Sequence, residues 1–134
     1  MDHRSRSFGC AFVIAGLGLF GLAIVIGLRG GTVFVGGGEP GSLILTASLV
    51  AAAVGFAILG LTGPAPFDRT GSRVGLGLLA VGLAGNVLTG IYSAGSTVDP
   101  LESLPILLVS GLGNLAVVVG VIVTAASLVR SAGA

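Results

Sequence analysis

Side chains that could take part in catalysis or ligand binding are few in this sequence of 134 residues. His3 is the only histidine and Cys10 the only cysteine, which excludes paired histidine ligands for haem, an internal disulfide and a two-cysteine redox relay. Asp99 and Glu102 are close in sequence, but their spacing around Pro100 is typical of a helix start and not of acid–base catalysis. We therefore expect no catalytic residue, no cofactor and no metal site.

Two asparagines, Asn86 and Asn114, are the polar side chains that stand out within long apolar segments. Asn86 lies about two residues after the middle of its segment and Asn114 about two residues before the middle of the next one, which runs the opposite way, so both amides come out at a similar depth on the outer side of mid-membrane. An amide without a partner is costly in hydrocarbon, so each must face protein or water. We hypothesise that Asn86 and Asn114 hydrogen-bond to each other or line one polar spot, as an interhelical contact and not as a ligand site.

Four apolar segments must position these residues: approximately 8–28, 42–61, 74–94 and 104–128, all without Asp, Glu, Lys, Arg or His. At about 1.5 Å of rise per residue, each is long enough to cross the roughly 30 Å core of a bilayer. Charged residues make up 8% of the chain, against about 25% in soluble domains. The sequence therefore predicts an all-α membrane protein, one integral membrane domain over residues 1–134, with four transmembrane helices in an antiparallel up-down bundle.

The arginines predict the orientation of the bundle. The segments that would share one side of a four-span chain hold most of the positive charge: Arg4, Arg6, Arg69, Arg73 and Arg130. The opposite side holds Arg29 together with three acids, Glu39, Asp99 and Glu102. By the positive-inside rule, both termini are expected in the cytoplasm. Because Lys is absent, a GC-rich genome is indicated, and we expect a multi-pass protein of a prokaryotic cell membrane.

The connections carry helix-boundary signals. Gly63 to Pro66 should end the second helix, and Ser42 is the expected N-cap at its start. Residues 30–38 are either a short extended piece over the outer mouth of the bundle or a flexible loop. Pro105 implies either a kink in the fourth helix or a separate turn before it, with Ser103 as the cap of the span.

Small residues form a stripe on each predicted helix, at steps of three, four and seven residues. Because lipid removes the hydrophobic drive between helices, such stripes are expected to form the packing faces. The stripes are Gly9, Gly16, Ala23 and Gly27; Ala47, Ala51 and Gly55; Gly82, Gly85, Thr89 and Ser93; Gly113, Ala116, Gly120, Thr124 and Ser127.

Two functional classes remain. An enzyme is not expected, because serines such as Ser48 and Ser110 have no residue within the spans to activate them. A proton-driven transporter is not expected either, because it normally needs a titratable group in the membrane and the four apolar segments contain no Asp, Glu, Lys, Arg or His. The first class is a non-catalytic accessory or assembly protein that acts on a membrane-protein partner or forms a homo-oligomer in the lipid bilayer. The alternative is a channel or facilitator for a small or neutral solute, lined by Asn86, Asn114, Thr89, Ser93, Ser110 and Tyr92. The net charge of +1 argues against a nucleic-acid partner.

Overall fold

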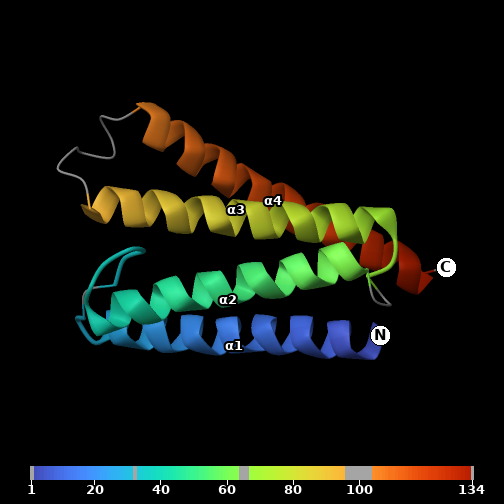
Figure 1. Cartoon of the computed structure of the whole chain (residues 1–134), viewed down its shortest axis with the longest axis horizontal. Coiled ribbons are helices and arrows are strands. Elements are labelled where there is room, and N and C mark those ends of the chain that lie inside the picture. The colour runs from blue at the N-terminus through green and yellow to red at the C-terminus, as the bar shows by residue number, and fades with distance from the viewer. Residues whose placement is uncertain (1, 32, 64–66, 96–103, 134) are drawn as a thin grey trace.

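The chain folds into four long helices (Figure 1). The computed structural model describes residues 2–31, 33–63, 67–95 and 104–133, and no strand occurs among them. The helices are α1 (Asp2–Leu28), α2 (Pro40–Thr62), α3 (Thr70–Gly95) and α4 (Leu104–Gly133). Each contains a segment long and apolar enough to cross a membrane: Arg6–Leu28, Pro40–Thr62, Thr70–Ser93 and Leu104–Arg130. The prediction of an all-helical protein with four spans is thus confirmed.

Helix α2 begins two residues before the expected N-cap. Glu39 is the N-cap residue, with extended backbone angles and no side-chain cap bond, and Pro40 occupies the first turn. The expectation for Ser42 is therefore wrong. Proline suits the first turn of a helix, because an N–H there would have no intrahelical acceptor and the φ angle of proline is already helical. The Ser42 hydroxyl instead donates a 3.3 Å hydrogen bond to the Glu39 carboxylate.

The end of α2 agrees with the sequence. Gly63 adopts the left-handed conformation, with φ 59°, and its N–H donates to the carbonyl oxygen of Leu59 at 2.9 Å. Such a C-terminal glycine satisfies carbonyls that the helix leaves open. Pro105 lies in the first turn of α4, a position that tolerates proline. The proposed caps Asp99, Glu102 and Ser103 lie outside the described residues.

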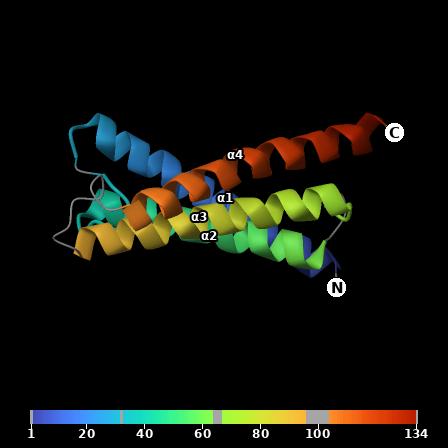
Figure 2. The ribbon, with the colours of Figure 1, turned by 90° about the horizontal axis from the view of Figure 1, so that it is seen from above.

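The helices pack in chain order. Backbone contacts join α1 to α2, α2 to α3 and α3 to α4, and within the described ranges none joins α1 to α4. Figure 1 shows both chain termini at the same end of the molecule. In the turned view of Figure 2, α1 and α4 cross in projection and do not run alongside each other. The two terminal helices are therefore the least covered by the rest of the chain.

Glycines bring α1 and α2 into backbone contact. A Cβ atom placed on Gly16 would lie 2.8 Å from the carbonyl oxygen of Ser48, and one on Gly55 would lie 2.7 Å from the carbonyl oxygen of Gly9. Real Cβ atoms do not approach a backbone oxygen so closely, so only glycine allows this separation. Ala23 extends the same face and is 1% exposed.

A second glycine contact joins α3 to α4. A Cβ on Gly82 would lie 2.6 Å from the carbonyl oxygen of Gly113, and a Cβ on Gly120 would lie 2.7 Å from that of Gly75. A buried hydrogen bond of 2.9 Å, from the Ser72 hydroxyl to that of Ser127, lies in the same interface. Close packing of small residues is the expected source of helix association in lipid.

The predicted stripe is buried or partly buried on α3 and α4, and on α1 except at Gly27, which is exposed; it is only partly correct for α2. Gly9, Gly16 and Ala23 are buried on α1, and Gly113, Gly120, Thr124 and Ser127 are buried on α4. On α2, Gly55 is buried but Ala47 is exposed, and the packing face instead contains Ser48 and Leu59. Alanine and serine are similar in size, so sequence spacing could not decide between the two faces.

Arg73 of α3 joins the two helix pairs. Its Nε donates to the carbonyl oxygen of Gly60 at 2.9 Å, and its Nη2 donates to that of Leu61 at 2.7 Å. A cation at the C-terminus of α2 complements the helix dipole and satisfies carbonyls that lack an intrahelical partner. Beside it, Leu59, Leu76 and Leu79 form the buried apolar cluster of the protein's described part.

We expect Gly82→Ala to weaken the α3–α4 contact, because the new methyl group meets backbone atoms of Gly113 and Val117 that cannot move aside cheaply. Overpacking of this kind costs about 1–3 kcal/mol. Gly77→Ala is the matched control on the same helix, since a Cβ there has nothing within 4 Å. Reversible unfolding in lipid or detergent measures both variants. Equal stabilities of the two would contradict the assigned contact.

Candidate functional site

A polar pocket lies between the last turns of α3 and the first turns of α4. Figure 1 shows these ends of the two helices opposite the chain termini. Its volume is about 300 Å³. Hydroxyl and amide side chains share its lining with apolar ones: Val35, Asn86, Thr89, Gly90, Ser93, Ile106, Leu107 and Ser110. Because none of these side chains is ionisable, the pocket can offer hydrogen bonds to water or a neutral solute, but no acid, base or activated nucleophile.

The structure brings together four of the six residues suggested for a channel. Asn86, Thr89, Ser93 and Ser110 line the pocket. Tyr92 is 61% exposed on the outside of α3, and Asn114 is exposed on α4. The spacing of 86, 89 and 93 along one helix was the sequence signal for this face.

The amide of Asn86 has a partner within its own helix. Its Nδ2 donates to the carbonyl oxygen of Gly82 at 2.9 Å. Gly113, the neighbour of Asn114, approaches Asn86 closely: a Cβ on Gly113 would lie 3.5 Å from the Asn86 amide nitrogen. The hypothesis that Asn86 and Asn114 share one polar spot stays a prediction, since the structure records only this intrahelical bond for Asn86.

Thr89 is similarly engaged in the α3 backbone. Its hydroxyl lies 3.0 Å from the carbonyl oxygen of Gly85 and 3.1 Å from that of Asn86. Hydroxyls that bond to the preceding turn in this way satisfy their donor without a second helix. The pocket therefore offers a solute mainly hydrogen-bond acceptors, together with the hydroxyls of Ser93 and Ser110.

The first connection covers this pocket. The N–H of Phe34 donates to the Ser42 hydroxyl at 3.0 Å, and the N–H of Gly36 donates to the Thr46 hydroxyl at 3.0 Å. Gly36 has φ 88° and lies against the backbone of Gly90. The described part of residues 30–38 forms turns and not a strand. It is anchored to the first turns of α2, which places it over the end of α3.

Sequence reasoning identified Ser42 only as a cap, and it missed Thr46 and Val35. Ser42 and Thr46 are one turn apart on α2, and Thr46 also donates to the Ser42 carbonyl oxygen at 2.9 Å. That spacing was a usable signal for a polar face at the start of the helix. No signal marked Val35, because its place in the pocket depends on how the connection folds back.

A second cavity, of about 270 Å³, lies between all four helices. Its lining exposes no polar surface. The one polar residue in it, Ser48, donates to the Leu45 carbonyl oxygen at 2.6 Å. Leu79 and Val117 lie on its α3 and α4 sides. A cavity of this kind stays dry, because water needs two or more polar partners.

Thr124, predicted as part of the small-residue stripe on the fourth span, is a further buried polar residue. It is 8% exposed, and its hydroxyl has no hydrogen-bond partner among the described residues. The hydroxyl lies against Gly75, in the gap left by the missing side chain. Thr124 therefore fills space between α3 and α4, at the energetic cost of a buried unpaired hydroxyl.

The described residues contain no group of three or more His, Cys, Asp or Glu side chains that could hold a metal ion. Cys10 is a free thiol, partly buried near the start of α1. It packs against the cluster of Leu59, Leu76 and Leu79. That position is typical of a small apolar side chain.

Comparison of the chain with protein-family models, curated proteins and solved structures finds no match.

We expect water to reach the polar pocket but not the central cavity. In a Cys10→Ala background, Ser110→Cys places a thiol in the pocket and Val117→Cys places one seven residues further along the same face of α4. A small hydrophilic thiol reagent applied to the protein in lipid nanodiscs should modify the first at least ~10 times faster, since the reaction requires a solvated thiolate. Comparable rates would show that the interior is hydrated throughout.

Proposed function

We propose that this protein is a small multi-pass membrane protein with a non-catalytic, accessory or assembly role, which it performs through helix–helix packing. The observation that carries the proposal is the dry interior. Between the helices there is an apolar cavity lined by all four of them, and glycine contacts hold the helices together within each pair. Polar lining occurs in the pockets near the two ends of the molecule. An interior of this kind favours packing over conduction, because selective pores are lined by carbonyl, amide, hydroxyl or charged groups where they bind the solute.

The outer surface supports the same proposal. The terminal helices bury the smallest share of their apolar segments, 11% for α1 and 17% for α4. Gly18 and Gly21 on α1 and Gly111 on α4 have nothing within 4 Å of an added Cβ. These positions let the backbone of another helix approach closely, which is how membrane helices associate. A membrane-protein partner or a second copy of this chain would use these faces.

We further propose that the helices form an antiparallel up-down bundle with both termini in the cytoplasm of a prokaryotic cell. The order of contacts supports this, because Gly9 lies against Leu59 while Gly16, further along α1, lies against the earlier residue Ser48. The five arginines of the tails and of the second connection support the orientation.

The second candidate is a channel or facilitator for a small or neutral solute. The polar pocket favours it, since Asn86, Thr89, Ser93 and Ser110 gather there. Below the pocket, however, Gly82 and Gly113 are in backbone contact. A solute would have to part α3 from α4 to continue.

The orientation predicts which connection faces the outside. In the Cys10→Ala background, we expect a membrane-impermeant maleimide to label Gly38→Cys, in the first connection, on intact cells. Asp68→Cys, in the second connection, should be labelled only after the cells are opened. Gly38 has open space around it and Asp68 is exposed, so neither change disturbs packing. The reverse labelling pattern would contradict the proposed orientation.

Association in the membrane tests the proposed role. We expect native mass spectrometry in mild detergent to find the chain in a complex heavier than the 13.0 kDa monomer. Gly18→Leu combined with Gly21→Leu should dissociate the complex, because bulky side chains keep another helix away. Gly38→Leu adds the same side chain at an open position outside the helices and should leave the complex intact.

Flux into liposomes separates the two candidates. The assembly role predicts no solute permeability above that of protein-free vesicles. A strictly monomeric protein that admits a neutral solute, and loses this activity with Ser110→Leu, would overturn the assembly proposal in favour of the channel.

A further inference from the structure

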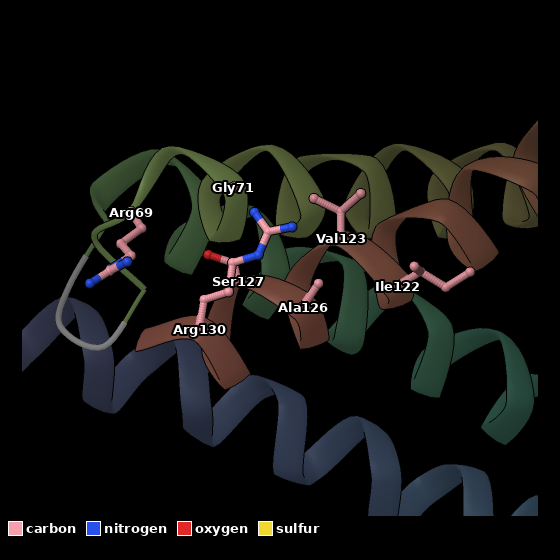
Figure 3. A pocket seen from close by; sticks show the side chains of 7 residues that line it. All are labelled: Arg69, Gly71, Ile122, Val123, Ala126, Ser127 and Arg130. Atoms are coloured by element: carbon pink, nitrogen blue, oxygen red, sulfur yellow. The ribbon is translucent and has the colours of Figure 1, made fainter. Parts of the chain in front are cut away.

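Two arginines, Arg69 and Arg130, lack side-chain bonds of the kind that Arg73 makes. Arg73 is bound to the carbonyls at the end of α2. Neither Arg69 nor Arg130 has a side-chain hydrogen bond or ion pair within the described residues. Both are exposed, yet both line one pocket at the end of the molecule that carries the termini (Figure 3).

This pocket has a volume of about 440 Å³ and lies between the start of α3 and the last turns of α4. Figure 3 shows the Arg130 side chain extending from α4 toward the first turn of α3, with Arg69 on the connection before α3. Gly71 and Ser127 complete its polar part. Ile122, Val123 and Ala126 form an apolar wall further along α4.

The polar part of the pocket suits an anion with several oxygen atoms. Two guanidinium groups offer forked donors that match a phosphate group. The first turn of α3 adds backbone N–H groups and the positive end of a helix dipole. Ser127 is 9% exposed and accepts a hydrogen bond from Ser72, so the proton of its own hydroxyl remains to be donated. Asp68 precedes Arg69 but does not line the pocket.

The position of the pocket indicates the source of the phosphate. The apolar segment of α4 ends at Arg130, so the guanidinium lies where lipid headgroups begin. Ile122 lies two turns deeper along the helix and is 61% exposed, which leaves it free to contact an acyl chain. Arginines at a membrane boundary with an apolar wall below them are the arrangement that basic lipid pockets use.

We propose that this pocket binds a phosphate group, supplied by the headgroup of an anionic phospholipid, with Arg69 and Arg130 as the paired ligands. The headgroup phosphate lies between the two guanidinium groups, and one acyl chain lies along Ile122 and Val123. The site is independent of the proposed assembly role, because it lies on the α3–α4 side at the arginine-rich end and involves neither Gly18 nor Gly21.

The test uses the full chain in phosphatidylcholine nanodiscs, titrated with phosphatidylglycerol and monitored by native mass spectrometry. We expect Arg69→Met and Arg130→Met each to weaken retention of the anionic lipid roughly fivefold, the usual effect of one arginine at an anionic surface. Arg29→Met removes the same charge from the opposite end and is the matched control. Since Arg69 and Arg130 have no intramolecular partners, their variants should unfold at the wild-type temperature.

Three results would overturn the proposal. Equal loss with Arg29→Met would show that only net charge matters. Equal retention of phosphatidylcholine and phosphatidylglycerol would show that the pocket does not select an anionic headgroup. Inorganic phosphate that binds at the two arginines and fully displaces phosphatidylglycerol would identify a soluble phosphate as the source. Retention that survives excess inorganic phosphate, but falls with Arg69→Met and Arg130→Met, supports the lipid.

Discussion

Backbone-to-backbone contact at glycine is the constraint on which the rest of this structure depends. In lipid, apolar side chains gain nothing by turning from the bilayer toward another helix, so association relies on close approach. Here that approach occurs between Gly9 and Gly55 in the first helix pair, and between Gly82 and Gly113 in the second. Each pair leaves no room for a Cβ. The two pairs are then joined through α2 and α3, where Arg73 binds the end of α2 and Leu59 packs with Leu76.

The same constraint separates a dry interior from polar ends. Where glycines bring α3 and α4 together, the buried polar side chains of the described residues are the small Ser72, Thr124 and Ser127. Where α3 and α4 diverge, Ser93 and Ser110 line the space between them at one end and Arg130 lines it at the other. The polar groups with room to meet a ligand therefore lie near the two membrane surfaces.

The candidate site was only partly predictable from sequence. A polar face on the third and fourth spans follows from the helical spacing of Asn86, Thr89 and Ser93. The hydrogen-bond partner of the Asn86 amide does not follow from the sequence. The carbonyl oxygen of Gly82, one turn back on the same helix, competes with any partner on another helix and needs no tertiary contact. For residues 30–38 the sequence left open a piece over the outer mouth or a flexible loop, and it could not show that two loop N–H groups bond to the hydroxyls of Ser42 and Thr46. Such long-range pairings leave no periodic trace.

What the sequence determined by itself was the number of spans, their helical nature and the end at which the arginines gather. These follow from the length of segments without charge, because hydrocarbon requires an internally bonded backbone and about 20 apolar residues fit a spanning helix, not a strand. Tertiary structure alone decided which small residues pack and which face outward. Gly75 and Gly77 are two residues apart on α3, and only the first meets α4. It likewise decided that Arg73 binds a helix end while Arg69 remains open to a ligand. The partner of a side chain depends on how each helix is rotated about its axis and on how it crosses its neighbours. In a soluble protein the hydrophobic pattern indicates this rotation, but in a membrane helix apolar residues cover every face and the pattern is absent.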